Sequence, residues 1–316
     1  EKIPVFYGVL ILYIILSAWI LHFLNLLNPH VWQKVTISLF SLFLLCCWKK
    51  RSNIKYGLKR KITFTLTNIL LFIFIIGWVS ITYFRIQSLP IMLSDAKTMH
   101  LFQQAVYFQE GGFVFHNSNT WESAFRPLNG LLWNMFFSIF LEDNTLIEAP
   151  QIISWVGIIL ISGAIFSQLK INDKLAGLVM LCIGFSPRIL SLSTNNFIDL
   201  PSLFYFSGII YFLIKLEHSK AFKIIDFLML GTYCGAYLGA RMQALILVPL
   251  LFIYFLIIFF KKNPKSYKIL ILPILITILF GIGKYLINFF EYGTPIPLNI
   301  NDSTSISLIK LFKNYK

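Results

Sequence analysis

Charged side chains are scarce in this sequence. Asp, Glu, Lys and Arg together make up 13% of its 316 residues, whereas about a quarter is usual in a soluble globular domain. Hydrophobic residues reach 57%, and the mean hydropathy is +0.75. This composition excludes an ordinary soluble domain and predicts an integral membrane protein.

Acidic residues are the scarcer of the two charged types, with 13 against 27 basic residues and a net charge of +14. An excess of this size can indicate nucleic-acid binding. Here the basic residues cluster between apolar runs, at 49–61, 215–223 and 261–268. That distribution is typical of the cytoplasmic loops of a membrane protein, so we expect no nucleic-acid partner.

Cysteine is also rare, and its spacing fits neither a zinc site nor a disulfide framework. The four cysteines lie inside apolar runs, which predicts small buried side chains: Cys46, Cys47, Cys182 and Cys234. The residues identify no cofactor, and a divalent cation is the one candidate left open.

The apolar runs are long and continuous. About 20 helical residues cross the hydrocarbon core of a bilayer, whereas strands of a barrel would alternate apolar and polar residues. We therefore predict an all-α fold, a polytopic transmembrane helical bundle. About nine spanning helices are expected, at 5–27, 31–48, 62–84, 151–169, 175–194, 198–216, 224–240, 243–260 and 267–289.

The charge distribution also predicts the topology. With residues 49–61 inside, the third helix ends outside, and the polar loop at about 85–150 faces the non-cytoplasmic side. A further apolar stretch at 128–141 would place the later basic loops outside if it crossed the membrane. We therefore predict a juxtamembrane helix there, and an amphipathic interfacial helix within 93–108.

Three side chains of this outer loop are candidates for chemistry. Asp95 is suited to act as a general base at the membrane surface, although an exposed loop Asp is often only a turn residue. His100 is a candidate contact to an acceptor or a sugar. Trp121, like Trp133, is suited to stack on a sugar or to anchor the chain in the aromatic belt of the interface.

Two further charges lie at the ends of later apolar runs. Asp199 precedes Leu200-Pro201, which is typical of a helix N-cap, but an acid at the mouth of a bundle is also a functional candidate. Arg241 is either an interfacial arginine or a site for a lipid phosphate, since guanidinium groups match phosphate oxygens. Arg188 is a weaker candidate of the same kind.

The order of motifs resembles the integral-membrane GT-C glycosyltransferases, in particular the family 39 and 83 branch with protein O-mannosyltransferases and lipid A aminoarabinose transferases. The resemblance covers about residues 62–300. Its motifs are Leu93-Ser94-Asp95, Glu110-Gly111-Gly112, Arg126-Pro127-Leu128, Ile198-Asp199-Leu200-Pro201, Leu238-Gly239-Ala240-Arg241 and Glu291-Tyr292-Gly293-Thr294-Pro295.

The resemblance implies transfer of a sugar from a polyprenyl-phosphate donor to a hydroxyl of a lipid, glycan or protein acceptor outside the membrane. It implies catalytic acids and a basic site for the donor phosphate. These are Asp95, Asp199 and Glu122 for catalysis, and Arg241 with Arg126 and Arg188 for the phosphate. Many relatives carry a second acid beside the first, whereas Asp95 is followed by Ala96-Lys97, so a paired-carboxylate metal site is not supported.

The expected organisation has three segments. Residues 1–61 form a two-helix membrane segment with a basic loop, 62–300 a GT-C-like catalytic module, and 301–316 a C-terminal tail. We expect a multi-pass protein of a bacterial inner membrane with an outward-facing site. The alternatives are a transporter or flippase for lipid-linked saccharides, an O-antigen polymerase or ligase, and a structural membrane subunit.

Overall fold

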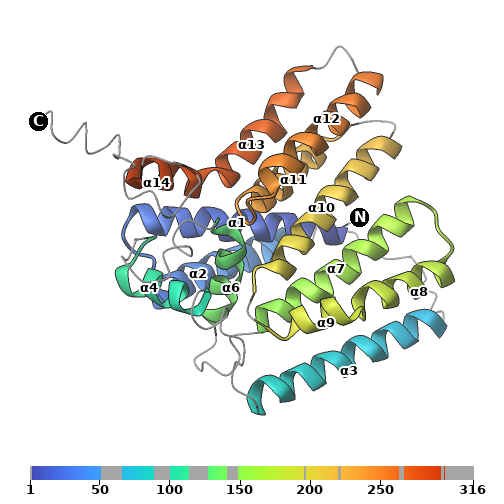
Figure 1. Ribbon diagram of the computed structural model, residues 1–316, viewed down its shortest axis with the longest axis horizontal. Coiled ribbons are helices and arrows are strands. Elements are labelled where there is room, and N and C mark those ends of the chain that lie inside the picture. The colour runs from blue at the N-terminus through green and yellow to red at the C-terminus, as the bar shows by residue number, and fades with distance from the viewer. Residues whose placement is uncertain are drawn as a thin grey trace, which may run out of the picture.

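A computed structural model provides the fold (Figure 1). It describes residues 2–50, 66–88, 100–113, 127–140, 149–195, 197–219, 222–262, 267–292 and 295. All regular secondary structure in this part of the chain is helical, which confirms the all-α prediction.

The helices follow one another along a single bundle. They are α1 (Lys2–Phe23), α2 (Pro29–Lys50), α3 (Leu66–Ser88), α4 (Phe102–Glu110), α6 (Asn129–Ser138), α7 (Ala149–Gln168), α8 (Asp173–Gly184), α9 (Pro187–Ser193), α10 (Asp199–His218), α11 (Ile224–Leu238), α12 (Ala244–Lys262), the 3-10 helix η4 (Tyr267–Leu270), α13 (Ile271–Gly281) and α14 (Gly283–Tyr292).

Four helices, α1, α7, α10 and α12, are long and apolar enough to cross a membrane. Two further helix pairs, α8 with α9 and α13 with α14, are long and apolar enough when each pair is taken as one span. They are bent by 60° and 51°, respectively, at a short break. The described residues therefore contain four candidate spans, or six if each bent pair is one span. This supports a helical membrane protein.

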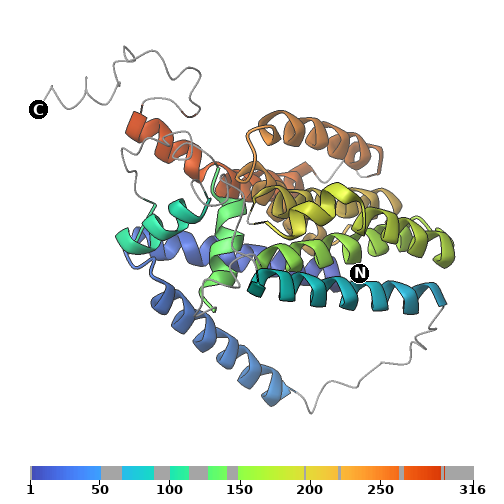
Figure 2. The same ribbon diagram turned by 60° about the horizontal axis from the view of Figure 1, so that its bottom comes forward.

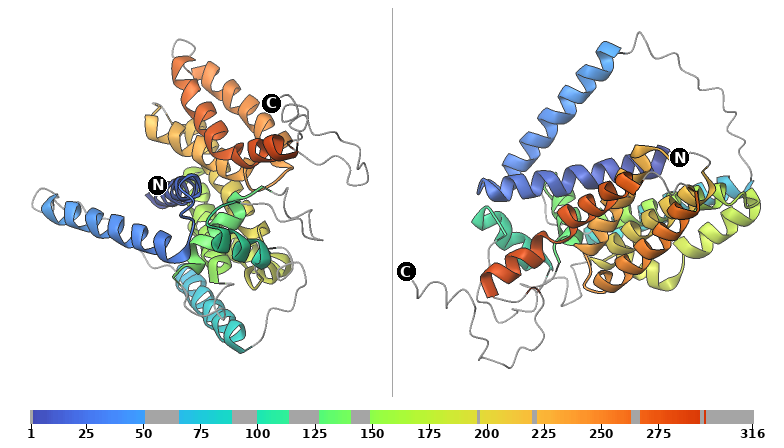
Figure 3. Two further views of the ribbon diagram at one scale, coloured as in Figure 1. Left: turned by 90° about the vertical axis from the view of Figure 1, so that its left-hand side faces the viewer. Right: turned by 90° about the horizontal axis from the view of Figure 1, so that it is seen from above.

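α11 lies near the middle of the bundle, where it packs against α13, α10 and α1. In contrast, α2 diverges from the other helices (Figures 2 and 3). Its apolar side chains are correspondingly exposed, with Ile37 at 52% and Phe40 at 60%. Exposed apolar faces of this size are expected where a helix faces lipid.

Glycines bring α11 and α13 into close contact. Gly231 and Gly235 are four residues apart, so they share one face of α11. A Cβ at Gly231 would lie 2.8 Å from the carbonyl oxygen of Pro273, and one at Gly235 would lie 2.8 Å from the Cβ of Phe280. Small residues at such a spacing let the backbones of membrane helices approach closely.

Buried amide and imidazole side chains gather at one end of the bundle, which we call the polar end. It contains α4, α6, α14, the starts of α7 and α10 and the ends of α9 and α11 (Figure 1). Every buried Asn, Gln and His among the described residues lies there: His100, Gln103, Gln104, Asn129, Asn134, Gln151, Asn195 and Asn288. The opposite end has instead a buried ion pair between Lys215 and Asp226, at 2.8 Å.

The stretch predicted as a juxtamembrane helix, 128–141, contains α6. The ten residues of α6 rise about 15 Å, half of a bilayer core, so α6 cannot span a membrane alone. However, α6 does not lie on the surface. Its first eight residues are buried against α1, α7, α10 and α11.

Other expectations were wrong in detail. Trp133 neither anchors a belt nor faces a sugar, because it is fully buried and its Nε1 donates to the carbonyl of Pro150 at 3.3 Å. Cys234 is buried as predicted, but Cys182 is exposed. The predicted amphipathic helix corresponds in part to α4, whose Phe102 is 43% exposed while its neighbour Gln103 is buried.

We expect Gly231→Ala to lower the free energy of unfolding by about 1–3 kcal/mol, because the added methyl group collides with the backbone of α13. Detergent-induced unfolding of the purified protein measures this change. Gly77→Ala is the matched control, since nothing lies within 4 Å of a Cβ at Gly77. Equal stability of the two variants would contradict the close packing of α11 on α13.

Candidate functional site

An ion pair joins two candidate residues at the polar end. Nη2 of Arg241 contacts Oδ1 of Asp199, although the two residues are far apart in the sequence. Asp199 is the first residue of α10, and Arg241 lies in the turn between α11 and α12. The side chains are 37% and 26% exposed, respectively, so the pair lies at the mouth of the bundle and not in its core.

Asp199 is not the N-cap of its helix. Ile198 occupies the cap position, and no side chain caps the helix there. The carboxylate of Asp199 lies in the first turn, where the helix dipole favours a negative charge. The N-cap interpretation is therefore wrong, and the carboxylate is directed to Arg241.

Beside this pair lies an open pocket of ≈ 250 Å³. Arg241 is the one charged residue in its lining, and most of the other lining residues are apolar. The lining consists of Pro127, Ile198, Ala240, Arg241, Met242 and Gln243. A single cation in an apolar pocket at the end of membrane helices suits an anionic group attached to a hydrocarbon.

The turn that carries Arg241 is fixed by Asn129, the first residue of α6. The backbone N–H of Asn129 donates to the carbonyl of Gly239 at 2.7 Å. Its Nδ2 donates to the carbonyls of Gly235 at 3.2 Å and Phe280 at 2.8 Å. A side chain at position 239 would collide with the Asn129 amide, so the contact requires glycine.

Two tyrosines complete this arrangement. The hydroxyl of Tyr285 donates to the carbonyl of Leu238 at 3.1 Å, and that of Tyr205 donates to the carbonyl of Asn129 at 3.1 Å. The last carbonyls of a helix have no partner within it. At the end of α11, the hydroxyl of Tyr285 on α14 supplies a partner for Leu238, and the backbone N–H of Asn129 on α6 supplies one for Gly239. The Arg241 turn is therefore held by several helices at once.

The segment before Asp199 is held in a similar way. Nε2 of Gln151 donates to the carbonyl of Phe197 at 2.7 Å and to Oδ1 of Asn134 at 2.9 Å. Nδ2 of Asn134 also donates to the Phe197 carbonyl, at 3.4 Å. Since Asn134 lies on α6, this one short helix positions both halves of the ion pair.

The remaining predicted residues are divided between this site and its surroundings. His100 is buried and its ring lies 6.1 Å from that of Phe197, nearly perpendicular to it, so it packs beside the segment leading to Asp199. Arg188 is exposed in the first turn of α9 and does not line the pocket. Four predicted residues lie outside the described residues: Asp95, Trp121, Glu122 and Arg126.

The sequence prediction missed the residues that hold the site. Asn129 and Asn134 occur inside an apolar stretch and Gln151 begins another, which is the signal that could have identified them, since buried amides need hydrogen-bond partners. Gly235 and Gly239, one turn apart, are a similar signal of close helix packing. Among the described residues, no group of three or more His, Cys, Asp or Glu side chains is placed to hold a metal ion.

Comparison with known proteins adds no relative to this picture. No family model matches the chain, and neither the curated proteins nor the solved structures gave a match. Evidence for a function therefore comes from the geometry of the polar end.

We expect Asn129→Asp to destabilise the protein by at least about 1–3 kcal/mol, because a carboxylate cannot donate to the carbonyls of Gly235 and Phe280. Asn172→Asp is the matched control. Asn172 caps α8 by accepting from the backbone N–H of Lys174 at 2.9 Å, and Asp caps equally well. Thermal unfolding in detergent distinguishes the two variants, and an unchanged transition for Asn129→Asp would contradict the proposed role of its amide.

Proposed function

We propose that this protein is a membrane glycosyltransferase that takes a sugar from a polyprenyl-phosphate donor and passes it to a hydroxyl of a lipid, glycan or protein acceptor. The proposal extends the GT-C resemblance of the sequence. It rests above all on one observation: the ion pair of Asp199 and Arg241 borders an apolar pocket at the polar end of a membrane bundle.

Arg241 has the properties required of a phosphate ligand. It lines the pocket, and its guanidinium carries five N–H donors, more than one carboxylate oxygen uses. Such donors match the oxygens of a phosphate in pairs. The carboxylate of Asp199 fixes the orientation of the guanidinium before the donor arrives.

The proposed reaction is a direct displacement at the anomeric carbon of the sugar. The acceptor oxygen forms a bond to this carbon as its proton passes to a carboxylate, for which the resemblance implies Asp95. The bond between the anomeric carbon and the phosphate oxygen breaks, and the polyprenyl phosphate leaves with the electron pair. A preorganised cation such as Arg241 stabilises the negative charge that develops on this leaving group.

The proposal includes nine spans and an outward-facing polar end. If α2, α3 and α11 cross the membrane besides the six candidates among the described residues, the total is nine. The basic residues at the opposite end, among them Lys215 and Lys262, then lie on the cytoplasmic side, as the charge rule requires. The proposed location is the inner membrane of a bacterium.

A transporter or flippase for lipid-linked saccharides is the second candidate. Transporters bind their substrates at broken helices, and the described residues contain two bent helix pairs, with breaks before Pro187 and at Ile282. The two candidates differ in one product. A transferase forms a new glycosidic bond, whereas a flippase moves the intact lipid-linked sugar across the membrane.

We expect Arg241→Gln to reduce transfer of a labelled sugar from polyprenyl phosphate by about 10²–10³-fold, because the leaving group loses its cation. The assay uses the purified protein in proteoliposomes with both an acceptor pool and a flipping readout. Lys174→Gln, an equal charge change on an exposed residue at the opposite end, should retain full transfer. Undiminished transfer by Arg241→Gln overturns the proposed site, and movement of intact donor without transfer favours the flippase.

Labelling of single cysteines tests the orientation. In a background with the four native cysteines replaced by serine, Gln243→Cys places a thiol at the polar end and Glu217→Cys places one at the opposite end, both on exposed residues. A membrane-impermeant maleimide should label the first in intact cells and the second only after permeabilisation. The reverse pattern would place the proposed site in the cytoplasm.

A further inference from the structure

The pocket beside Arg241 is small for the donor that we propose. Its volume is ≈ 250 Å³, below the roughly 300–1,000 Å³ of pockets that enclose a drug-sized ligand. It has room for a phosphate head group and not for a long hydrocarbon chain. The chain of a bound polyprenyl phosphate must therefore lie elsewhere along the helices.

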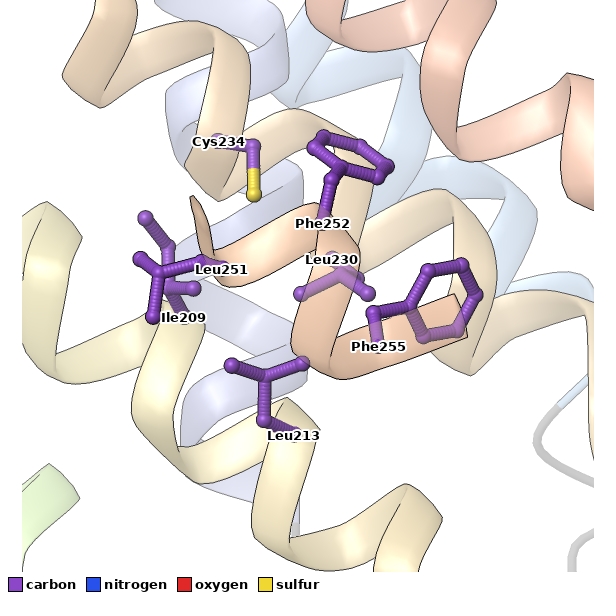
Figure 4. A pocket seen from close by; sticks show the side chains of 7 residues that line it. All are labelled: Ile209, Leu213, Leu230, Cys234, Leu251, Phe252 and Phe255. Carbon is purple, nitrogen blue, oxygen red and sulfur yellow. The ribbon is translucent and has the colours of Figure 1, made fainter. Parts of the chain in front are cut away.

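A second pocket lies between the helices that border the first. It is formed by α10, α11 and α12 (Figure 4), and α10 begins at Asp199 while α11 and α12 flank the Arg241 turn. Its walls carry only carbon atoms and one sulfur. We call it the apolar slot, and it is lined by Ile209, Leu213, Leu230, Cys234, Leu251, Phe252 and Phe255.

The apolar slot lies deeper in the bundle than the ion pair. Cys234 is about one turn from the end of α11 and Leu251 about two turns into α12, which corresponds to depths of about 5 and 11 Å. A molecule with its anionic group at Arg241 and its chain directed toward the middle of the bilayer would pass the slot.

We propose that the apolar slot binds the first part of the isoprenoid chain of a polyprenyl phosphate whose phosphate lies at Arg241. This inference rests on the proposed function and assigns its donor a second subsite. A hydrocarbon chain loses no hydrogen bond when it enters a slot without polar atoms, whereas a polar group would lose its hydrogen bonds to water there. The cation at one end and the apolar walls below it together fit an anionic lipid.

The slot must widen to admit a chain, because its empty space is only ≈ 150 Å³ and is too narrow for a water molecule. Five of its seven side chains are buried, and the two half-buried ones, Leu251 and Phe252, both belong to α12. α12 is also the least buried of the four long candidate spans. In its apolar segment 28% of the residues are buried, against 67% in that of α10. The chain therefore enters by displacing α12.

α12 contains a position where it can bend. Pro249 lies inside the helix, where it removes a backbone hydrogen bond and permits a bend. At the far end of α12, Nζ of Lys262 donates to the carbonyl of Ser219 at 2.9 Å. The slot residues of α12 all follow Pro249, so they move away from α10 and α11 when α12 bends at Pro249 and tilts about its end at Lys262.

Photocrosslinking tests this subsite without requiring sugar transfer. p-Benzoylphenylalanine replaces Phe252, which lines the slot, or Ile253, which is 56% exposed on the same helix and does not line it. The full chain in nanodiscs is irradiated with radiolabelled polyprenyl phosphate. We expect saturable labelling at position 252, competed by unlabelled polyprenyl phosphate and reduced by about tenfold or more in Arg241→Gln, because a charge-assisted contact is lost. Labelling at 253 should be non-saturable and unaffected.

Each other outcome has a defined meaning. Equal, non-saturable labelling at both positions overturns the subsite, and so does competition by phosphatidylglycerol as effective as that by polyprenyl phosphate, which would indicate an ordinary membrane lipid. Sugar transfer without saturable labelling at 252 overturns the subsite and leaves the proposed function. Saturable labelling at 252 without transfer of any sugar retains the subsite and counts against the transferase.

Discussion

The amide of Asn129 is the contact on which the polar end depends. From the start of α6 it donates to carbonyls of α11 and α13, while its backbone binds Gly239. These bonds form only because glycines on α11 let the helices approach closely. Without Asn129, the carbonyls of Gly239 and Phe280 would lose the donors that compensate their desolvation, whereas that of Gly235 would keep its bond from the backbone N–H of Gly239. This network fixes the position of the Arg241 turn, because the last bonded carbonyl, that of Gly239, lies two residues before Arg241.

The ion pair of Asp199 and Arg241 is a consequence of that framework. Neither side chain is buried deeply enough for the pair to stabilise the fold strongly, since exposed ion pairs contribute little. Its value lies in orientation: α6 brings the start of α10 and the end of α11 together, and the carboxylate then holds the guanidinium at the pocket. A fixed cation facing an apolar pocket is the feature that favours a lipid phosphate as ligand.

Buried polar groups are stabilised by different interactions at the two ends of the bundle. At the end opposite the site, Lys215 and Asp226 neutralise each other in the core. At the polar end the amides bind backbone carbonyls and leave the one charged pair at the mouth.

The helical class, the membrane setting and the candidacy of Asp199 and Arg241 follow from the sequence, because apolar run length and isolated charges are local properties. The pairing of these two residues is a tertiary feature, since N-capping and ion pairing by Asp199 have the same local pattern. The burial of α6 was likewise beyond the sequence. The charge distribution placed the short stretch with Asn129 and Asn134 at the interface. The hydrogen-bond partners of these two amides come from segments distant along the chain, and only folding brings those carbonyls within reach.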